Sequence, residues 1–187
     1  MLVSARIVAA ALLLFAGAVA AAPRPLIAAN SRIEFSIKQM PVTVSGQFTR
    51  LDAFIDLDPM KPETSSAKIS VDIASLTTGD NDADAIAVDK PWLDKATFPQ
   101  ALFTSSAVKR VGPDRYEVKG AMTIRGKTRA ITVPLTTAAQ SNGSVVASGG
   151  FRLQRSVFGI GGGEWNEGDV VADDVAVTFH LVLGAVH

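Results

Sequence analysis

Three segments of this chain alternate apolar and polar residues with a period of two. Ile33, Phe35 and Ile37 stand between polar neighbours, and residues 69–73 and 175–181 repeat the pattern. Because successive side chains of a β-strand point to opposite faces of the sheet, each segment has one apolar face and one polar face. Such strands are typical of antiparallel sheets, which bury one face and expose the other to water.

Further strands complete this pattern. They are predicted at residues 101–105, 115–124, 127–135 and 144–154. Residues 42–57 form either one bent strand or a strand pair, because their apolar positions change parity near Thr49 and Arg50. A tight hairpin is expected at Arg125-Gly126, since glycine adopts positive φ without strain. About eight strands result, which is enough to close a barrel and remove free edges.

One interval, residues 79–99, does not follow the β pattern. Asp80 and Asn81 precede an alanine-rich run and suit the N-terminus of a helix, where such side chains cap free amides. Pro91 is expected to end that helix or to start a second short one. The predicted fold class is all-β: a lipocalin-like antiparallel eight-stranded barrel with a short helical insertion.

The first 22 residues have a different composition from the rest of the chain. Arg6 precedes an apolar run from Ile7 to Val19, and three alanines follow at 20–22. A basic start, a short apolar centre and small residues at the end are typical of a secretory signal peptide, and the run is shorter than the ~20 residues of a membrane span. We therefore expect residues 1–20 to be a signal peptide, cleaved after Ala20 or Ala21, and the protein to be periplasmic. With no cysteine after it, no stable membrane anchor is expected.

Composition excludes several classes of function. The absence of cysteine excludes disulfides, thiolate metal sites and cysteine nucleophiles, and two histidines leave little for a histidine-rich metal centre or a Ser-His-Asp triad. Lysine and arginine total 18 against 18 acidic residues, so charge gives no reason to expect nucleic acid as a partner. No cofactor, metal or catalytic residue is predicted.

Three sequence features resemble functional motifs but have simpler interpretations. Asp80, Asp82 and Asp84 lack the glycine and distal glutamate of a calcium loop, so helix capping is favoured. Residues 159–163 lack the last glycine of a dinucleotide loop, which favours a bend between strands. His180 has the parity of the outward face. Two carboxylates on neighbouring strands could still act as an acid–base pair, but the sequence selects none.

The apolar faces leave two alternatives for the interior. A barrel of this size is just wide enough for its own side chains to fill it or for it to hold one small ligand. The sequence alone does not choose between a packed core and a hollow one.

Seven motifs, in this order, resemble YceI-like domains. They are residues 31–38 (SRIEFSIK), 46–52 (GQFTRLD), 73–79 (IASLTTG), 98–105 (FPQALFTS), 120–129 (GAMTIRGKTR), 155–161 (RSVFGIG) and 171–175 (VADDV). The resemblance covers residues 26–183, expected to be one domain. It implies a lipocalin-like barrel, usually periplasmic or secreted, that holds a long isoprenoid or similar amphiphilic lipid and has no established catalytic residues. Many relatives carry an Arg-Asp-Ala-His-like stretch where this chain has residues 82–86 (DADAI), which leaves the identity of the lipid open.

If the barrel holds such a lipid, the inward positions are its wall. The wall residues are predicted to be Phe35, Ile37, Phe48, Ile73, Phe103, Met122, Ile124, Phe151, Val177 and Phe179. The mouth or lid is predicted to contain Ile86, Trp92, Leu93 and Phe158. An anionic head group is predicted to meet Arg125, Lys127 and Arg155, although cations at hairpins are usually solvated. A purely apolar wall suffices for the tail, since each buried CH₂ contributes about 0.8 kcal/mol.

Three functions fit this sequence. The first is a non-catalytic periplasmic protein that binds or carries an isoprenoid or similar lipid. The second is a quinone-binding accessory of membrane redox chemistry, which relatives joined to cytochrome-b-like membrane domains suggest. The third is an enzyme that acts on a lipid substrate. Whether the protein forms a homodimer is left open.

Overall fold

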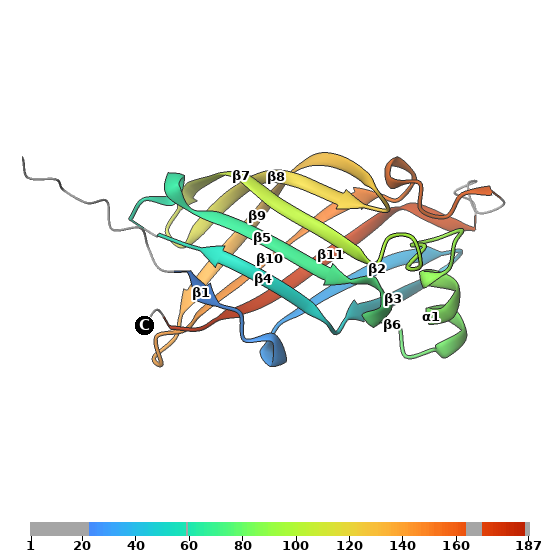
Figure 1. Ribbon diagram of the computed structural model, residues 1–187, viewed down its shortest axis with the longest axis horizontal. Coiled ribbons are helices and arrows are strands. Elements are labelled where there is room, and N and C mark those ends of the chain that lie inside the picture. The colour runs from blue at the N-terminus through green and yellow to red at the C-terminus, as the bar shows by residue number, and fades with distance from the viewer. Residues whose placement is uncertain (1–22, 59, 164–169, 186–187) are drawn as a thin grey trace, which may run out of the picture.

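The computed structural model describes residues 23–58, 60–163 and 170–185. Within these ranges eleven strands form one antiparallel sheet that curls around a long axis (Figure 1). The strands are β1 (Arg24–Pro25), β2 (Arg32–Gln39), β3 (Val42–Phe48), β4 (Leu51–Asp56), β5 (Ser66–Asp72), β6 (Leu76–Thr77), β7 (Gln100–Gly112), β8 (Arg115–Ile124), β9 (Lys127–Ala139), β10 (Val145–Gln154) and β11 (Val171–Leu183). One α-helix, α1 (Asn81–Val88), and four short 3₁₀ turns, η1 (Ala28–Asn30), η2 (Pro62–Thr64), η3 (Ile73–Ser75) and η4 (Ser156–Phe158), complete the described elements.

The predicted fold class, an all-β antiparallel barrel with a short helix, is confirmed. The strands lie side by side in the order β1-β4-β5-β7-β8-β9-β10-β11-β2-β3-β6. The sheet has eleven strands rather than eight, partly because bends divide β3 from β4 and β5 from β6, and partly because the two-residue β1 was not predicted. In this order β4 and β5 lie near one edge of the sheet, and β3 and β6 lie near the other. Since β4 follows β3 in the chain and β6 follows β5, the two bends connect these edges.

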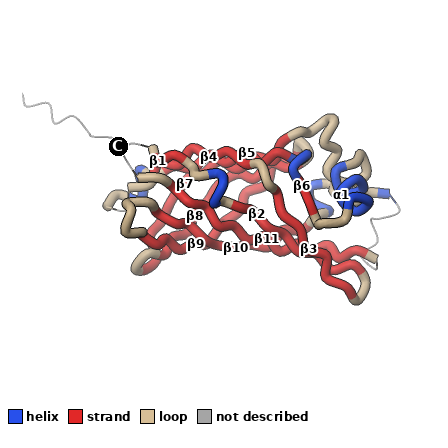
Figure 2. Tube along the Cα trace, turned by 90° about the horizontal axis from the view of Figure 1, so that it is seen from below, coloured by secondary structure: helices blue, strands red, loops and turns tan. Residues whose placement is uncertain are grey.

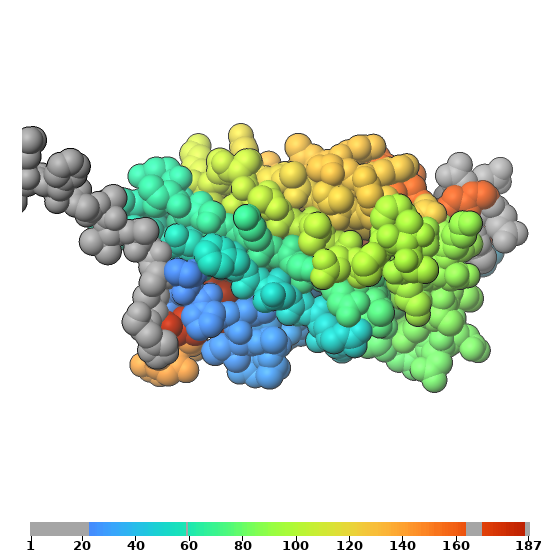
Figure 3. Space-filling model, in the orientation of Figure 1, coloured from blue at the N-terminus to red at the C-terminus, as the bar shows by residue number. Residues whose placement is uncertain are grey.

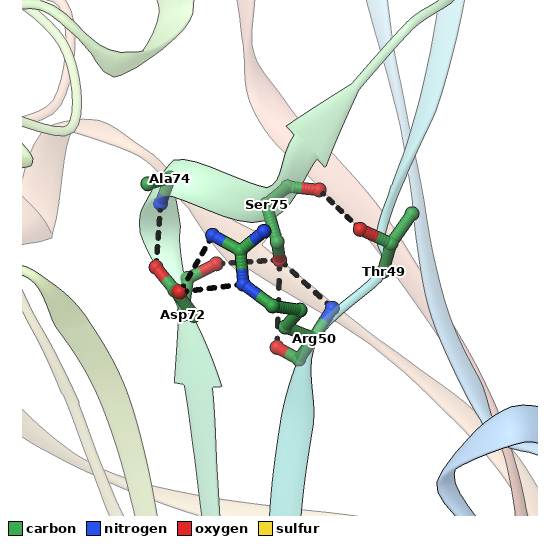
Figure 4. A network of polar contacts seen from close by, with 5 residues as sticks. All are labelled: Thr49, Arg50, Asp72, Ala74 and Ser75. Atoms are coloured by element: carbon green, nitrogen blue, oxygen red, sulfur yellow. Dashed lines mark hydrogen bonds and ion pairs between the residues drawn. The ribbon is translucent and has the colours of Figure 1, made fainter.

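Side chains hold the two bends together (Figure 4). Arg50 Nε donates to Asp72 Oδ2 at 2.9 Å, and Arg50 Nη2 lies 2.8 Å from the same oxygen. The hydrogen bond from Arg50 lowers the pKa of Asp72 below its ordinary value. Ser75 Oγ accepts from the Arg50 amide at 3.0 Å, and the Thr49 amide donates to the Ser75 carbonyl at 3.1 Å. These contacts hold the two bends side by side at the place where the backbone hydrogen bonds between the strands are interrupted.

Strand β7 is much longer than the predicted strand over residues 101–105. A register shift between Ser105 and Ala107 places an extra residue in this strand. Such a bulge changes the parity of the following positions, so Phe103 before it and Val108 after it are both buried. The strict alternation of inward and outward residues therefore ends at the bulge, although the strand itself continues to Gly112.

The molecule has two different ends (Figures 2 and 3). The helix end carries α1, the β2–β3 turn and the β8–β9 turn, whereas the termini end carries β1, the β9–β10 turn and the last residues of β11. Helix α1 begins as predicted, because the Asp80 side chain accepts from the amides of Asp82 and Ala83 at 2.9 and 3.2 Å. In the described part of the chain no helix is long and apolar enough to cross a membrane.

Candidate functional site

The inner faces of the strands enclose a cavity of about 410 Å³. Side chains from β2 to β11 and from α1 form its wall, and most of them are aliphatic or aromatic. Small-molecule sites usually measure about 300–1,000 Å³ and have walls of this kind. Of the two alternatives that the sequence leaves open, the structure therefore has the hollow interior.

All ten residues predicted for the wall line this cavity. They are Phe35, Ile37, Phe48, Ile73, Phe103, Met122, Ile124, Phe151, Val177 and Phe179. Alternation explains this agreement, since each of them lies on the inner face of its strand or, for Ile73, directly after one. That these residues contact a lipid stays a prediction.

Three phenylalanine rings lie close to inward-facing glycines of neighbouring strands. The pairs are Phe35 over Gly46, Phe103 over Gly120 and Phe179 over Gly149. A Cβ atom on each glycine would lie 2.5, 2.5 and 2.6 Å from the Cζ of its phenylalanine. Because the glycines have no side chain, the rings can lie against the backbone of the wall rather than extend across the interior. This arrangement helps to keep the barrel hollow.

The cavity reaches the outside beside α1. Ile86 lines the cavity and is also 52 % exposed, and Ala83 and Ala87 on the same helix line it as well. Thr78 and Gln39 also line the cavity, and we call this region, between α1 and the end of β2, the mouth. That Ile86 belongs to a mouth or lid for a ligand stays a prediction.

The other predicted mouth residues divide into two groups. Trp92 and Leu93 line the cavity near α1. Phe158 does not lie on the wall: it is 1 % exposed and packs with Ile124 and Ile160 behind the wall. It was predicted as a lid residue because it lies in a loop, but turn η4 folds this side chain into the core.

Arg155 differs most from its predicted environment, because it is buried rather than solvated. Its side chain is 2 % exposed and lines the cavity at the helix end. The guanidinium lies 5.4 Å from the centre of the Trp92 ring. It donates at 2.9–3.1 Å to the backbone carbonyls of Ile160, Gly161, Val171 and Ala172. Arg155 therefore fastens the glycine-rich bend to the start of β11.

Arg125 and Lys127 lie at the helix end, and neither is among the residues that line the cavity. Arg125 and Gly126 both have positive φ, 50° and 69°, which confirms the tight hairpin. The Arg125 side chain donates to the carbonyl of Gly159 and, at 2.7 Å, to that of Lys90. Lys127 is exposed. That Arg125 and Lys127 contact a head group stays a prediction.

The wall also contains polar residues that the alternation of apolar residues does not predict, besides Arg155. At the helix end these are Gln39 and Thr78, and at the termini end they are Asp56, Ser65, Ser66, Tyr116 and Thr137. The signal for Tyr116 is its parity, because it alternates with outward residues in step with Val118 and Met122 on β8. Polar groups thus lie at both ends of the cavity, and apolar side chains line the space between them.

Comparison with known proteins agrees with the predicted resemblance. The family model of the YceI-like domain matches residues 26–183. The crystal structure of Burkholderia cenocepacia BcnA is 38 % identical, with a TM-score of 0.81, over 84 % of this chain and 98 % of that chain. A polyisoprenoid-binding domain from Saccharophagus degradans, implicated in plant cell wall breakdown, shares the fold with a TM-score of 0.72 at 17 % identity, over 87 % of this chain and 98 % of that chain.

A curated relative gives a partial match. The UPF0312 protein of Pseudomonas savastanoi pv. phaseolicola is 32 % identical over 105 residues, which are 56 % of this chain and 55 % of that protein. The chain thus spans about half the length of the curated relatives that it matches. The match to the family model, by contrast, covers most of the sequence, and the chain belongs to the YceI-like domain family.

Proposed function

We propose that this protein binds a long-chain isoprenoid or a similar amphiphilic lipid in the barrel cavity, without turnover. The observation that carries the proposal is the cavity of about 410 Å³, with an apolar middle and a mouth beside α1. An apolar chain gains about 0.8 kcal/mol for each buried CH₂ group and needs no polar partner along its length. The cavity offers this environment along the barrel axis.

The fold comparison supports the same class of ligand. The Saccharophagus degradans domain that shares this fold is named for binding polyisoprenoids. The residues of our chain that would contact such a ligand are the wall residues named above, and the three phenylalanine–glycine pairs would leave room for it.

A role as a periplasmic carrier extends this proposal. The predicted signal peptide, residues 1–20, lies outside the described residues and would direct export. A carrier between membranes needs a polar outer surface and an apolar interior, and the alternation along the strands supplies both. No nucleic acid is proposed as a partner.

Native mass spectrometry of protein purified gently from its own host tests the proposal. We expect a stoichiometric adduct that organic extraction identifies as an isoprenoid or similar lipid. A bare mass in every preparation, together with no uptake of added lipid, would contradict the proposal.

A pair of variants makes this test specific to the cavity. Ala147→Phe adds a ring on the wall and is expected to reduce the adduct, whereas Ala138→Phe adds the same ring at an exposed position of β9 and is expected to retain it. Equal adducts in both variants would place the lipid outside the cavity. Circular dichroism checks that both variants are folded.

A further inference from the structure

The β2–β3 hairpin at the helix end extends beyond the short strand β6 that pairs with it. On the side of β3 that faces away from β2, only Gln47 and Phe48 pair with β6. Among the described residues no strand or backbone hydrogen bond covers this edge of residues 42–46. After β6 the chain turns into α1, which contacts β6 (Figure 1). The hairpin therefore has a free edge on the side of the sheet where α1 follows.

The inner face of this hairpin is apolar and continues the cavity wall to the outside. Ile37 and Val44 are opposite each other in the β2–β3 ladder, and both line the cavity. Val42 has the parity of Val44, so its side chain lies on the same face, two residues nearer the tip, where it is 61 % exposed. Met40, at the tip, is 66 % exposed. The Met40 amide donates to the Val170 carbonyl at 2.8 Å, which fixes the tip beside the start of β11.

Helix α1 supplies the apolar side chain on the other side of the mouth. Ile86 lines the cavity and is more than half exposed. We call Met40, Val42 and Ile86 the lip. Single exposed apolar residues are normal on a protein surface, but several of them around one opening indicate a surface that meets an apolar partner.

The continuity of the lip with the cavity wall favours a lipid surface as this partner. An isoprenoid that enters the cavity from a membrane has to pass the mouth, and every CH₂ group that crosses water on the way raises the free energy of transfer. A lip placed against the membrane removes the aqueous step. A stable protein interface, by contrast, usually takes about 20–30 residues on each side, far more than the three of the lip.

The charges beside the lip restrict the kind of lipid. Four aspartates lie in or next to α1: Asp80, Asp82, Asp84 and Asp89. Lys38 on the hairpin and Lys90 after the helix offset only part of this negative charge. Surfaces that bind anionic lipids are rich in lysine and arginine instead. The lip therefore suits lipids without net charge.

We propose that the lip docks on the surface of a membrane whose lipids carry no net charge, so that the mouth opens directly to the lipid. The inference rests on the proposed function and adds the partner from which the ligand enters. The free edge of β3 limits the depth of docking, because backbone groups without partners are unfavourable in the hydrocarbon region. The lip thus lies at the level of the head groups.

Flotation with vesicles of phosphatidylcholine tests the inference. The double variant Met40→Asn/Val42→Thr changes two lip residues that do not line the cavity, and asparagine suits the positive φ of 53° at position 40. We expect its partitioning onto the vesicles to fall about 5- to 20-fold relative to the wild type. Met60→Asn/Val111→Thr makes the same exchanges at exposed positions outside the lip and is the matched control, expected to float like the wild type. The intact mass of each preparation establishes whether residues 1–20 are present.

Uptake of Nile red and of geranylgeraniol without vesicles separates this inference from the function on which it rests. If the wild type takes up neither, the proposed function fails. If it takes them up but does not float, or if the two double variants float equally, lipid binding stands and docking through the lip is rejected.

Two further measurements test the choice of partner. Stronger flotation with vesicles that contain phosphatidylglycerol than with phosphatidylcholine alone, at low salt, would overturn the preference for uncharged lipid. Sedimentation velocity of the wild type without lipid is expected to show no dimer that depends on the lip. A dimer that Met40→Asn/Val42→Thr dissociates would instead assign the lip to a second copy of the chain.

Discussion

The two ends of the barrel are closed in different ways. At the termini end most of the contacts are backbone hydrogen bonds: β1 pairs with β4, Leu26 pairs with Leu183, and the Ile27 amide donates to the Val182 carbonyl at 2.8 Å. At the helix end the segments outside the sheet are joined by backbone bonds, such as that from the Gly161 amide to the Pro91 carbonyl at 2.9 Å, and in addition by several side chains. Arg155 and Arg125 donate to carbonyls of the glycine-rich bend, and Asp84 binds Thr78.

This difference concerns how each end of the cavity is held. Backbone pairing depends little on which side chains are present, so the closure of the termini end should tolerate single substitutions. The helix end depends in addition on a few individual side chains, and Ile86 brings the wall to the surface there. If this comparison holds, single substitutions can loosen the helix end without affecting the termini end.

The largest effect is expected from Arg155→Met. The variant leaves four backbone carbonyls without their donor in a buried place, and we expect the free energy of unfolding to fall by about 3–5 kcal/mol. Urea denaturation measures the loss. Hydrogen exchange is expected to increase at residues 159–162 more than at β1 and the end of β11.

The control is Arg152→Met on β10, since Arg152 is exposed and is expected to contribute less than about 0.5 kcal/mol. Equal losses in the two variants would show that Arg155 does not hold the helix end together.

A second prediction concerns the wall between the two ends. In Gly149→Ala the new Cβ would meet the Pro134 carbonyl and would lie 2.6 Å from Cζ of Phe179. The ring must move towards the interior, so we expect a loss of about 1–3 kcal/mol in stability and a reduced capacity for lipid. Thermal denaturation and Nile red binding measure the two effects.

Gly162→Ala is the matched control, because no atom lies within 4 Å of the position of its Cβ. We expect this variant to differ from the wild type by less than about 0.5 kcal/mol. If both variants are equally stable and bind Nile red equally, the phenylalanine–glycine pairs do not determine the width of the cavity.

The wall could be predicted from the sequence because alternation is a strong constraint. A residue such as Phe35 or Val177 must face inward once its strand is assigned, since the period of two fixes its face. The same rule misses the glycines of the wall, because a position such as Gly149 carries no hydrophobic signal. It also misses the second half of β7, where the bulge after Ser105 changes the parity.

The helix end could not be predicted to the same extent, for a physical reason. Loop residues have no period, so nothing in the sequence distinguishes a buried Arg155 from a solvated arginine, or a core Phe158 from a lid residue. Their positions depend on tertiary hydrogen bonds and packing that form only when distant segments meet. Tyr116 is hard to predict for another reason: its parity places it on the inner face, but tyrosine is partly polar and gives a weaker hydrophobic signal than its neighbours.

A third prediction tests the termini end. Arg24 Nη1 donates to the carbonyls of Gly143 and Gly184 at 3.1 and 3.0 Å, and we expect Arg24→Ala to lower the free energy of unfolding by about 1 kcal/mol. The loss is smaller than for Arg155→Met because the backbone pairing of β1 remains. Urea denaturation beside Lys109→Ala, an exposed position of β7, measures it. A loss as large as that of Arg155→Met would mean that side chains close both ends.

The smallest effect is expected from a change of pH at the helix end. The Thr78 hydroxyl and amide donate to Asp84 Oδ1 at 2.7 and 2.6 Å, and these hydrogen bonds, that of the hydroxyl first, lower the pKa of Asp84. A lowered pKa in the folded state means that the ionised carboxylate stabilises the fold above the ordinary Asp value of about 3.9, and that this contribution is lost as the pH falls through the folded pKa. The wild type should therefore be more stable than Asp84→Asn at neutral pH, and the difference should narrow in acid. Melting temperatures of both proteins from neutral to acidic pH measure this difference. A difference that does not change with pH would mean that the amide replaces the carboxylate equally well, and that charge has no part in holding α1 at the mouth.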